Sequence, residues 1–495
     1  MRRFGADPVA IADGHAGAGI FTRSGLYWKV IPRTRSRTRY SGMPSAFRRK
    51  STHKGASIMA NTRQSRSFIP TLAAAAFALA SATVAAAPPA ITLGQIAPFT
   101  GSGAEFGQFY RDGAALAVQH LNAAAEATLG GPIIAAHIAE DSATSPTPAV
   151  EAALSLIQVH GVPAIIGGWS SGVTVAVATS ATIPAGVLQV SNGSTSPLIS
   201  ILPEDRDADL LFRTTASDAL QGVVAAQLAR GELVDGYRFD TVSTIYVNNP
   251  YGQGLSNAFS RSFQLRGGTV HAQIPHPEET QPTYTAQLAS AYKDRPDLLF
   301  AASYPGHSAI YLQEARDVFK HTTWQLVDGN LADEVVAAVG ADTIDKVYGT
   351  TPGQDPNRAE FKAFAEQFKA AFGHDRVPPF TESAYDAAMV IGLALVKAYA
   401  DGHEKVGDIT GTVLRDRLRD VANAPGRTIA AGDLDSLKAG LQAIMNGEDV
   451  QYSGAAGPVE FDDNGDVLTP IAIVQYQDGV AVTIDIRSPE DIPAE

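Results

Sequence analysis

Residues 91–122 read ITLGQIAPFTGSGAEFGQFYRDGAALAVQHLN, and the hydrophobic period changes within them. The first seven residues form a near-continuous apolar run, which is typical of a buried strand. Ala114, Ala117, Val118 and Leu121 then recur at helical spacing. A buried strand that leads through a glycine-rich loop into a helix is the first half of a β-α-β unit, and it favours a parallel sheet covered by helices.

The same alternation continues along the chain in two series and predicts an α/β protein with two doubly wound lobes. In the first series we expect strands at 132–140, 162–168 and 187–190 and helices at 147–160 and 173–181. In the second we expect strands at 241–247, 269–274, 297–302, 324–328 and 345–350 and helices at 284–293, 306–319 and 331–339. Further helices are expected around Phe361–Phe372 and at 382–400, 409–421 and 433–446, before a hairpin pattern from Pro458 to Ile486.

Composition excludes several classes of protein. The chain has 495 residues, of which 45% are hydrophobic and 18% charged, so it is not a disordered chain. It contains no cysteine. Disulfides, thiolate metal sites, cysteine nucleophiles and a lipid-modified N-terminal cysteine are therefore excluded.

The charge is distributed unevenly. Residues 1–58 carry twelve lysines and arginines against two acids, whereas the chain after Ala86 carries 24 basic and 49 acidic residues. A folded part with a net charge of -25 repels phosphate backbones, so nucleic acid is not an expected partner.

The basic front end has the order of a secretory signal. From Met59, two arginines precede an apolar run from Phe68 to about Ala80, and small residues follow. We therefore expect a signal peptide at 59–86 with cleavage near Ala86, which makes the mature chain soluble, exported and periplasmic. Residues 1–58 are then a basic upstream extension, either disordered or translated from a misplaced start codon.

Ligands of open α/β sheets bind beyond the carboxyl ends of the strands, so the strand-to-helix loops are where a site is expected. These loops are rich in glycine, hydroxyl groups and aromatic rings and contain almost no cations. The first series supplies PFTGSGAEFG (98–107), GGWSSG (167–172) and SNGSTSP (191–197), and the second supplies NNPYGQG (248–254), ASYPGHS (302–308) and VDGN (327–330).

One loop allows a catalytic interpretation. Gly168–Gly172 fits the G-x-S-x-G pattern of hydrolase nucleophile elbows and lies between a predicted strand and helix. Nothing marks the acid or histidine that a serine hydrolase also needs. The plainer interpretation is that Ser170 and Ser171 cap the following helix.

Two other motifs are weak. Gly101, Gly103 and Gly107 resemble a degraded dinucleotide fingerprint, but Pro98 and Thr100 separate them from the strand. Asp462–Asp466 begins like a calcium loop without its final glutamate, and Asn464–Gly465 predicts a hairpin turn instead. The nine histidines after Ala86 show no paired ligand spacing, so no metal or cofactor is expected.

The loops together resemble those of the leucine/isoleucine/valine-binding family of ABC importers, which have the type I periplasmic binding fold. Several ordered segments from about Ile91 to the C-terminus carry the resemblance. They are residues 91–122, Glu140–Ser142, the loop around Ser170–Ser171, SNGSTSP, FRTTASDALQG (212–222), YGQGL (251–255), LLFAASYPGHSAIYLQEARD (298–317) and GPVEFDDNGD (457–466).

The resemblance implies two lobes joined by three crossover strands and no catalysis, so the protein is not expected to be an enzyme. The crossings should fall near Phe212–Thr214, Thr350–Gly353 and Gly457–Phe461. The first lobe then comprises 87–213 with 354–456, and the second comprises 214–353 with 457–495.

The resemblance also implies the ligand-binding residues. In the first lobe, Ser171, Gly193, Ser194 and Thr195 match positions that hold a ligand carboxylate through hydroxyls and backbone amides, and such amides favour an anion without an arginine. Phe106 matches an aromatic wall. In the second lobe, Tyr251 and Tyr304 match rings that cover the ligand, and Asp328 matches the acid that receives its ammonium group.

The implied function is that of a monomeric substrate-binding protein that captures a small molecule, a branched-chain or related amino acid, and delivers it to an ABC permease in the inner membrane. The alternatives are an amide, urea-like compound or aromatic acid as ligand, a ligand-sensing role, or the serine hydrolase. Trp169, Gly172 and Ser303 depart from residues common in the family, as does the long stretch 425–454. These departures leave the ligand's side chain open more than its amino-acid class.

Overall fold

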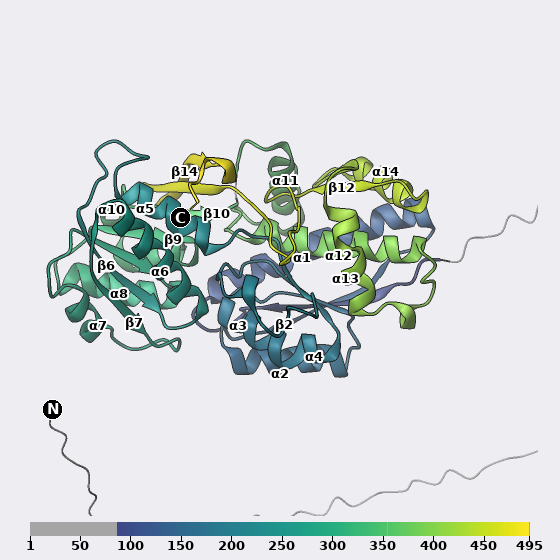
Figure 1. Ribbon diagram of the computed structural model, residues 1–495, viewed down its shortest axis with the longest axis horizontal. Helices are drawn as coiled ribbons and strands as arrows, with labels where there is room; N and C mark the ends of the chain where they lie inside the picture. Colours follow the sequence, from purple (N-terminus) through teal and green to yellow (C-terminus); the bar gives the residue numbers. More distant parts are fainter. Residues whose placement is uncertain (1–86, 354, 495) are drawn as a thin grey trace, which may run out of the picture. The chain divides into compact units, whose positions relative to one another are not determined.

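The computed structural model describes residues 87–353 and 355–494. The predicted upstream extension at 1–58 and the signal peptide at 59–86 lie outside the described residues. The described chain forms two sheets of parallel character covered by helices, which is the two-lobed α/β architecture expected from the sequence (Figure 1). We call the five-stranded sheet with its helices the first lobe and the seven-stranded sheet with its helices the second lobe.

The sheet of the first lobe is parallel throughout, with strand order β2-β1-β3-β4-β5. Its strands are short and almost wholly buried at the centre, as expected for a sheet covered on both faces. They are β1 (Ile91–Ala97), β2 (Ile134–Asp141), β3 (Ala164–Ile166), β4 (Leu188–Ser191) and β5 (Leu211–Arg213).

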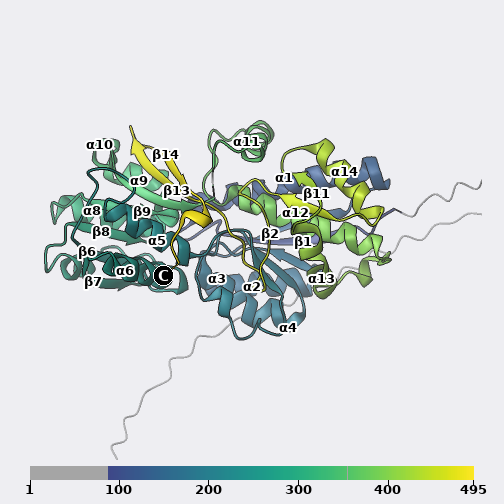
Figure 2. The same cartoon turned by 45° about the horizontal axis from the view of Figure 1, so that its top comes forward.

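Two separate apolar clusters cover the faces of this sheet. One face packs against α2 (Pro146–Gln158) and α3 (Ser171–Val177), followed by η1 (Ala178–Thr182) and α4 (Ile183–Ala185). The other face packs against helices from distant parts of the sequence, which lie side by side in Figures 1 and 2. They are α1 (Ala104–Leu129), α11 (Ala359–Phe372), α12 (Thr381–Ala400), α13 (Gly411–Ala422) and α14 (Leu434–Met445).

The sheet of the second lobe has the order β14-β13-β10-β9-β8-β6-β7, with β13 antiparallel to both of its neighbours. Its strands are β6 (Thr241–Val247), β7 (Thr269–His276), β8 (Leu298–Ala302), β9 (Trp324–Val327), β10 (Tyr348–Pro352), β13 (Ile471–Gln477) and β14 (Val480–Arg487). Its helices are α5 (Asp218–Ala229), α6 (Pro250–Leu265), α7 (Thr285–Ala291), α8 (Pro305–Asp317), α9 (Asp333–Val339) and α10 (Ala341–Ile344).

Short elements complete the described chain. A two-stranded parallel sheet, which the sequence analysis did not predict, joins β11 (Arg427–Ala430) and β12 (Val450–Ser453) beside α14. The remaining single turns are η2 (Ile199–Ile201), η3 (Asp328–Asn330), η4 (Val406–Asp408) and η5 (Pro489–Asp491).

The chain passes between the lobes at three places. It leaves the first sheet after β5 and enters α5, and it leaves the second sheet after β10. Val459, Phe461 and Val467 still pack in the first-lobe core, so the third passage lies between Val467 and Ile471, after the predicted crossing at 457–461. The full assignment of residues to lobes stays a prediction.

The predicted hairpin turn at Asn464–Gly465 is wrong. The turn between β13 and β14 is formed by Asp478 and Gly479, whose φ angles of 52° and 81° are the left-handed pair that a tight hairpin turn requires. The Asn464–Gly465 turn is closed by Asp462, whose carboxylate accepts N–H bonds from Asn464 (2.8 Å) and Asp466 (3.0 Å) and whose backbone carbonyl accepts the Gly465 N–H (3.1 Å). No strand pairing follows from it.

Helix α12 is long and apolar enough to cross a membrane by length and composition alone, but most of it is buried among the described residues. It lies against α1 and α13 within the first-lobe core. The apolar character of α12 is therefore explained by its position at the centre of this core.

The close approach of α1 and α12 depends on Gly113, because a Cβ at this position would overlap the Thr381 carbonyl oxygen. We predict that Gly113→Ala lowers the free energy of unfolding by about 1–3 kcal/mol, the usual cost of overpacking, despite the better helix propensity of alanine. Gly407→Ala is the control, because a Cβ at residue 407 meets nothing within 4 Å and the backbone there is not left-handed. Urea unfolding measures both, and equal stabilities would contradict the packing argument.

Candidate functional site

The loops at the carboxyl ends of the two sheets meet, and they bring all eight predicted ligand-binding residues to buried positions. In the first lobe, Ser171 is the first residue of α3, and Gly193–Thr195 lie in the loop 191–197 after β4, here called the carboxylate loop. Phe106 lies in the first turn of α1. In the second lobe, Tyr251 begins α6, Tyr304 precedes α8, and Asp328 follows β9.

Direct bonds between the lobes surround these residues. The Tyr304 hydroxyl donates to Ser170 Oγ at 2.9 Å, and the Gly306 N–H donates to the Ser102 carbonyl at 3.0 Å. Glu105 of α1 accepts the N–H groups of Asp333 and Glu334 at 2.9 Å each. Bonds on both sides of the site mean that the structure has the lobes closed on one another.

Aromatic rings from both lobes form one wall. Trp169 lies 5.4 Å from the Phe106 ring centroid and 4.8 Å from that of Tyr304, which stacks on Tyr251 at 5.4 Å. Trp169 fits because residues 103 and 193 are glycines, since a Cβ at either would overlap its indole ring. The wall is apolar, rigid and shaped by Trp169, the bulky residue that departs from the family pattern.

The hydroxyl groups of the first lobe differ in what they can offer. Ser194 Oγ contacts Thr174 Oγ1 at 2.6 Å and donates toward the Gly168 and Trp169 carbonyls. The Ser194 N–H donates to Ser191 Oγ at 3.0 Å, so both polar donors of Ser194 are used within the first lobe. Ser171 Oγ accepts the Ser196 N–H at 3.2 Å and keeps its own proton to donate. Thr195 Oγ1 is buried and has no hydrogen-bond partner among the described residues.

Two buried carboxylates lie close enough to interact. Asp328 receives a bond from Gln221 Nε2 at 2.6 Å and one from the Tyr251 hydroxyl, but burial still raises its pKa to about 7. Burial, reinforced by the charge of Asp328, raises the pKa of Asp218 well above its usual value. Desolvation and repulsion between like charges both favour the protonated form, so in the absence of a cation this pair retains protons near neutral pH.

The Asp218 carboxylate lacks internal partners. Neither oxygen accepts a full hydrogen bond from the described residues, although the Thr195 hydroxyl lies beside it and opposes the rise in its pKa. Arg213 acts on the Asp218 pKa through its charge but donates its hydrogen bonds to other groups. A fully buried carboxylate without donors indicates a missing cationic partner, because burying such a charge unpaired is costly.

Asp218 and Gln221 are site residues that sequence reasoning missed. Both lie in the quoted segment FRTTASDALQG, and their spacing of three residues places them on one face of α5. An acid in the first turn of a helix is ordinarily a favourable charge at the N-terminus, which hides any other role. Both side chains are polar yet fully buried in an otherwise apolar helix, and this burial is visible only in the structure.

The G-x-S-x-G segment is not arranged as a hydrolase elbow. Ser170 stands at the N-cap position of α3, but its side chain makes no capping bond, so the expected cap is wrong for Ser170. Its hydroxyl accepts a hydrogen bond from the Tyr304 hydroxyl, and no hydrogen bond from it to a histidine is seen among the described residues. His276 and His307 contact Ser303 instead, which lies within the second lobe.

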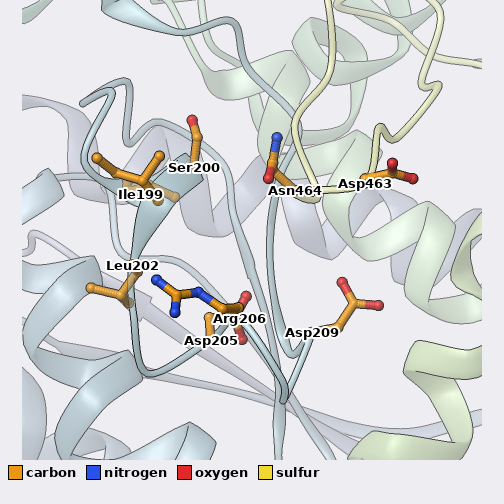
Figure 3. Close-up of a pocket in the computed structure, with 9 residues that line it drawn as sticks. Ile199, Ser200, Leu202, Asp205, Arg206, Asp209, Asp463 and Asn464 are labelled. Atoms are coloured by element: carbon orange, nitrogen blue, oxygen red, sulfur yellow. The ribbon is translucent and has the colours of Figure 1, made fainter.

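A separate surface cavity of about 250 Å³ lies between residues 199–209 and the turn at Asp463–Asn464 (Figure 3). Its wall includes three aspartates and Arg206 but none of the eight predicted ligand-binding residues. The candidate site is therefore the buried set between the lobes, not this cavity. Among the described residues, no group of three or more histidines and acids could hold a metal ion.

Comparisons with known proteins agree with this arrangement. Residues 90–480 match the model of a family described as periplasmic binding protein. A Pseudomonas aeruginosa leucine-, isoleucine-, valine-, threonine- and alanine-binding protein is 26% identical over 68% of this chain and 86% of its own. The chemotactic substrate-binding protein BasB of Halobacterium salinarum is 26% identical over 78% of this chain and 87% of its own. The crystal structure of a leucine-binding protein from Thermotoga maritima has the same fold, with a TM-score of 0.65, 23% identity and coverage of 81% and 99%.

The raised pKa of Asp328 predicts how stability depends on pH in the ligand-free protein. The folded state binds the Asp328 proton more tightly than the unfolded state, so this contribution to stability is complete below about pH 4 and is lost as the pH rises through about 7. We predict that the stability of Asp328→Asn relative to wild type rises by roughly 2 kcal/mol between pH 5 and pH 8, because only the wild type loses stability as Asp328 ionises. Chemical unfolding at both pH values measures this, and an equal difference between the two proteins at pH 5 and pH 8 would contradict it.

Proposed function

Because the chain belongs to the periplasmic binding protein family, we propose that it captures an α-amino acid with an apolar side chain for an ABC importer. The observation that carries the proposal is the buried Asp218–Asp328 pair, which needs a cation between the lobes. An α-ammonium group supplies that charge. The ligand's carboxylate then lies at the Ser171 hydroxyl and at the hydroxyl and N–H of Thr195, which offer donors without a formal charge. The neighbouring N–H groups of the carboxylate loop donate to the Ser191 and Ser171 hydroxyls instead.

The aromatic wall selects the rest of the ligand. Phe106, Trp169 and Tyr304 present ring surface rather than donors, so the side chain that contacts them is apolar. This favours a branched-chain or related amino acid. A carboxylic acid without an amino group would leave both aspartates without a cation, which makes the aromatic-acid alternative the weaker one.

Capture occurs by closure. The ligand binds the first lobe in the open form, and the second lobe then brings Tyr251, Tyr304 and Asp328 over it by rotation about the three crossings. The ligand favours the closed form only through contacts that the open form lacks, and Asp328 with its two neighbouring rings provides them. A membrane permease then recognises the closed lobes. The signal at 59–86 directs the chain to the periplasm, and the mature protein acts as a monomer.

A sensing role uses the same capture step. BasB is named as the substrate-binding protein of a chemotactic signal transduction system, so a related protein carries a signalling role in its name. Both roles begin with the same ligand in the same site. Transport and sensing therefore differ in which protein binds the closed form. Ligand uptake by cells that lack this gene separates the two roles: reduced uptake supports transport, and unchanged uptake supports sensing.

Thermal unfolding of residues 87–495, refolded to remove ligand, tests the proposal against a panel of amino acids, amides and aromatic acids. A ligand at 100 times its dissociation constant adds roughly 2.7 kcal/mol to the free energy of unfolding, so its Tm shift is readable. We predict shifts with apolar α-amino acids that are lost in Asp328→Ala and in Asp218→Asn.

Asp386→Asn is the matched control, because Asp386 is also a buried acid, with its pKa raised to about 6 by burial, but it accepts its bonds from Tyr452, Ala455 and Ala456 in the first lobe. This variant should keep its shift even if its own Tm falls. Shifts only with carboxylates that lack an amino group would contradict the roles of Asp218 and Asp328.

A further inference from the structure

An ion pair outside the set of site residues joins two segments that are far apart in the sequence. Arg213 ends β5 in the segment FRTTASDALQG, and Asp466 ends the segment GPVEFDDNGD, which runs toward the third crossing. The Arg213 side chain is fully buried, and its Nε and Nη2 atoms donate to the two Asp466 oxygens at 2.7 and 2.6 Å. A bidentate pair of this kind fixes both distance and orientation.

The remaining donors of Arg213 hold the carboxylate loop. Its Nη1 donates to the Ser194 carbonyl at 3.2 Å and to the Ser196 carbonyl at 3.0 Å. Its Nη2 also donates to Ser200 Oγ at 2.9 Å, and this hydroxyl donates to Asp466 at 2.6 Å. One guanidinium therefore links the last strand of the first sheet, the loop after β4 and the turn at 462–466.

The bond to the Ser194 carbonyl sets the direction of the next amide. In a trans peptide the C=O and N–H groups point to opposite sides, so the Thr195 N–H faces away from the guanidinium. Thr195 is also fixed from its other end, because its carbonyl accepts the Asp218 N–H at 2.7 Å. The amide and hydroxyl of Thr195 are thus oriented by Arg213 on one side and by α5 on the other.

The turn that carries Asp466 is held against β5. The Arg213 N–H donates to the Gly465 carbonyl at 3.0 Å, and Gly465 has a φ of 74° and lies so close to the Leu211 carbonyl that a Cβ would contact it at 2.7 Å. Arg419 of α13 donates to the Asp462 carbonyl from the far side. The turn is exposed at residues 462–464 but is fixed to β5 and α13 by these bonds, so it can support Asp466.

We propose that Arg213, oriented by Asp466, is the positioning residue of the carboxylate loop: it does not touch the ligand but fixes the Thr195 amide that does. The assignment of a ligand carboxylate to this loop rests on the proposed function. The orientation of the loop by Arg213 does not, and it can be measured without a ligand.

The first test is hydrogen exchange in ligand-free protein, followed in peptides that cover 191–198. Arg213→Lys keeps the charge but cannot reach Asp466 and both carbonyls together, and Asp466→Asn loses the charged acceptor. We expect both variants to exchange these amides at least tenfold faster than wild type. Ser200→Ala removes the two bonds of the Ser200 hydroxyl and leaves the ion pair, so it should give a milder increase, and it keeps the test decisive if the other variants fail to fold.

Arg358→Lys is the matched control. Arg358 is also largely buried and donates to Ser453 Oγ at 3.2 Å and the Gly454 carbonyl at 3.1 Å, beside Glu360, so it anchors a segment of the first lobe that is not the carboxylate loop. Its replacement should leave exchange in 191–198 at the wild-type rate.

The second test is calorimetric titration with L-leucine as the probe. We expect its dissociation constant to rise at least tenfold in Arg213→Lys and less than twofold in Arg358→Lys, with Asp466→Glu recovering part of the affinity lost in Asp466→Asn. If wild type binds no amino acid, the proposed function fails while hydrogen exchange still decides the inference. If the loop amides exchange at the wild-type rate in both Arg213→Lys and Asp466→Asn, the proposed positioning role of Arg213 is overturned.

Discussion

Two carboxylates, Asp218 and Asp328, are buried between the lobes with too few donors to stabilise their charges. Asp386, another buried acid, differs from them because it accepts three bonds within the first lobe. Asp218 and Asp328 lie where the strand ends of both sheets converge. In the proposed function, the ammonium group of the ligand supplies the positive charge that lets both carboxylates ionise in the closed form.

The fold explains why these groups come together. Parallel sheets place all their strand-to-helix loops at one edge, and two such edges face each other here. In the proposed site, the first lobe supplies hydroxyls and a backbone amide, and the second supplies an acid with two tyrosines. Asp218 lies just after the first passage between the lobes, so the proposed closure would leave it near the hinge and bring Asp328 toward it.

Much of this architecture is visible in the sequence, because buried parallel strands are apolar runs that are shorter than most helices. β1 and β6 match their expected ranges, and the eight predicted site residues are all buried. The roles of those residues are not visible in the sequence. Whether the Ser194 hydroxyl faces a ligand or the Gly168 carbonyl depends on side-chain rotation, which leaves no periodic pattern in the sequence.

The predictions that failed also depended on contacts that leave no periodic pattern in the sequence. Asn464–Gly465 has the residues of a hairpin turn, but pairing is decided by which segments meet, and there the Asp462 side chain closes the turn instead. Helix α5 was not predicted because its apolar residues surround the whole helix, as burial on all sides requires, and leave no stripe. Arg213 and Asp466 are separated by most of the chain, and only the folded structure shows that they form a pair.

The most direct test of the account is the number of protons released when the protein binds an apolar α-amino acid at pH 7. Titration calorimetry of L-leucine in Tris and in phosphate measures it, since Tris gives off more heat than phosphate on taking up a proton. An ammonium group between Asp218 and Asp328 lowers both pKa values, so binding should release protons and be more exothermic in Tris. Equal heats in the two buffers, for an amino acid that binds, would contradict the central role of the carboxylate pair.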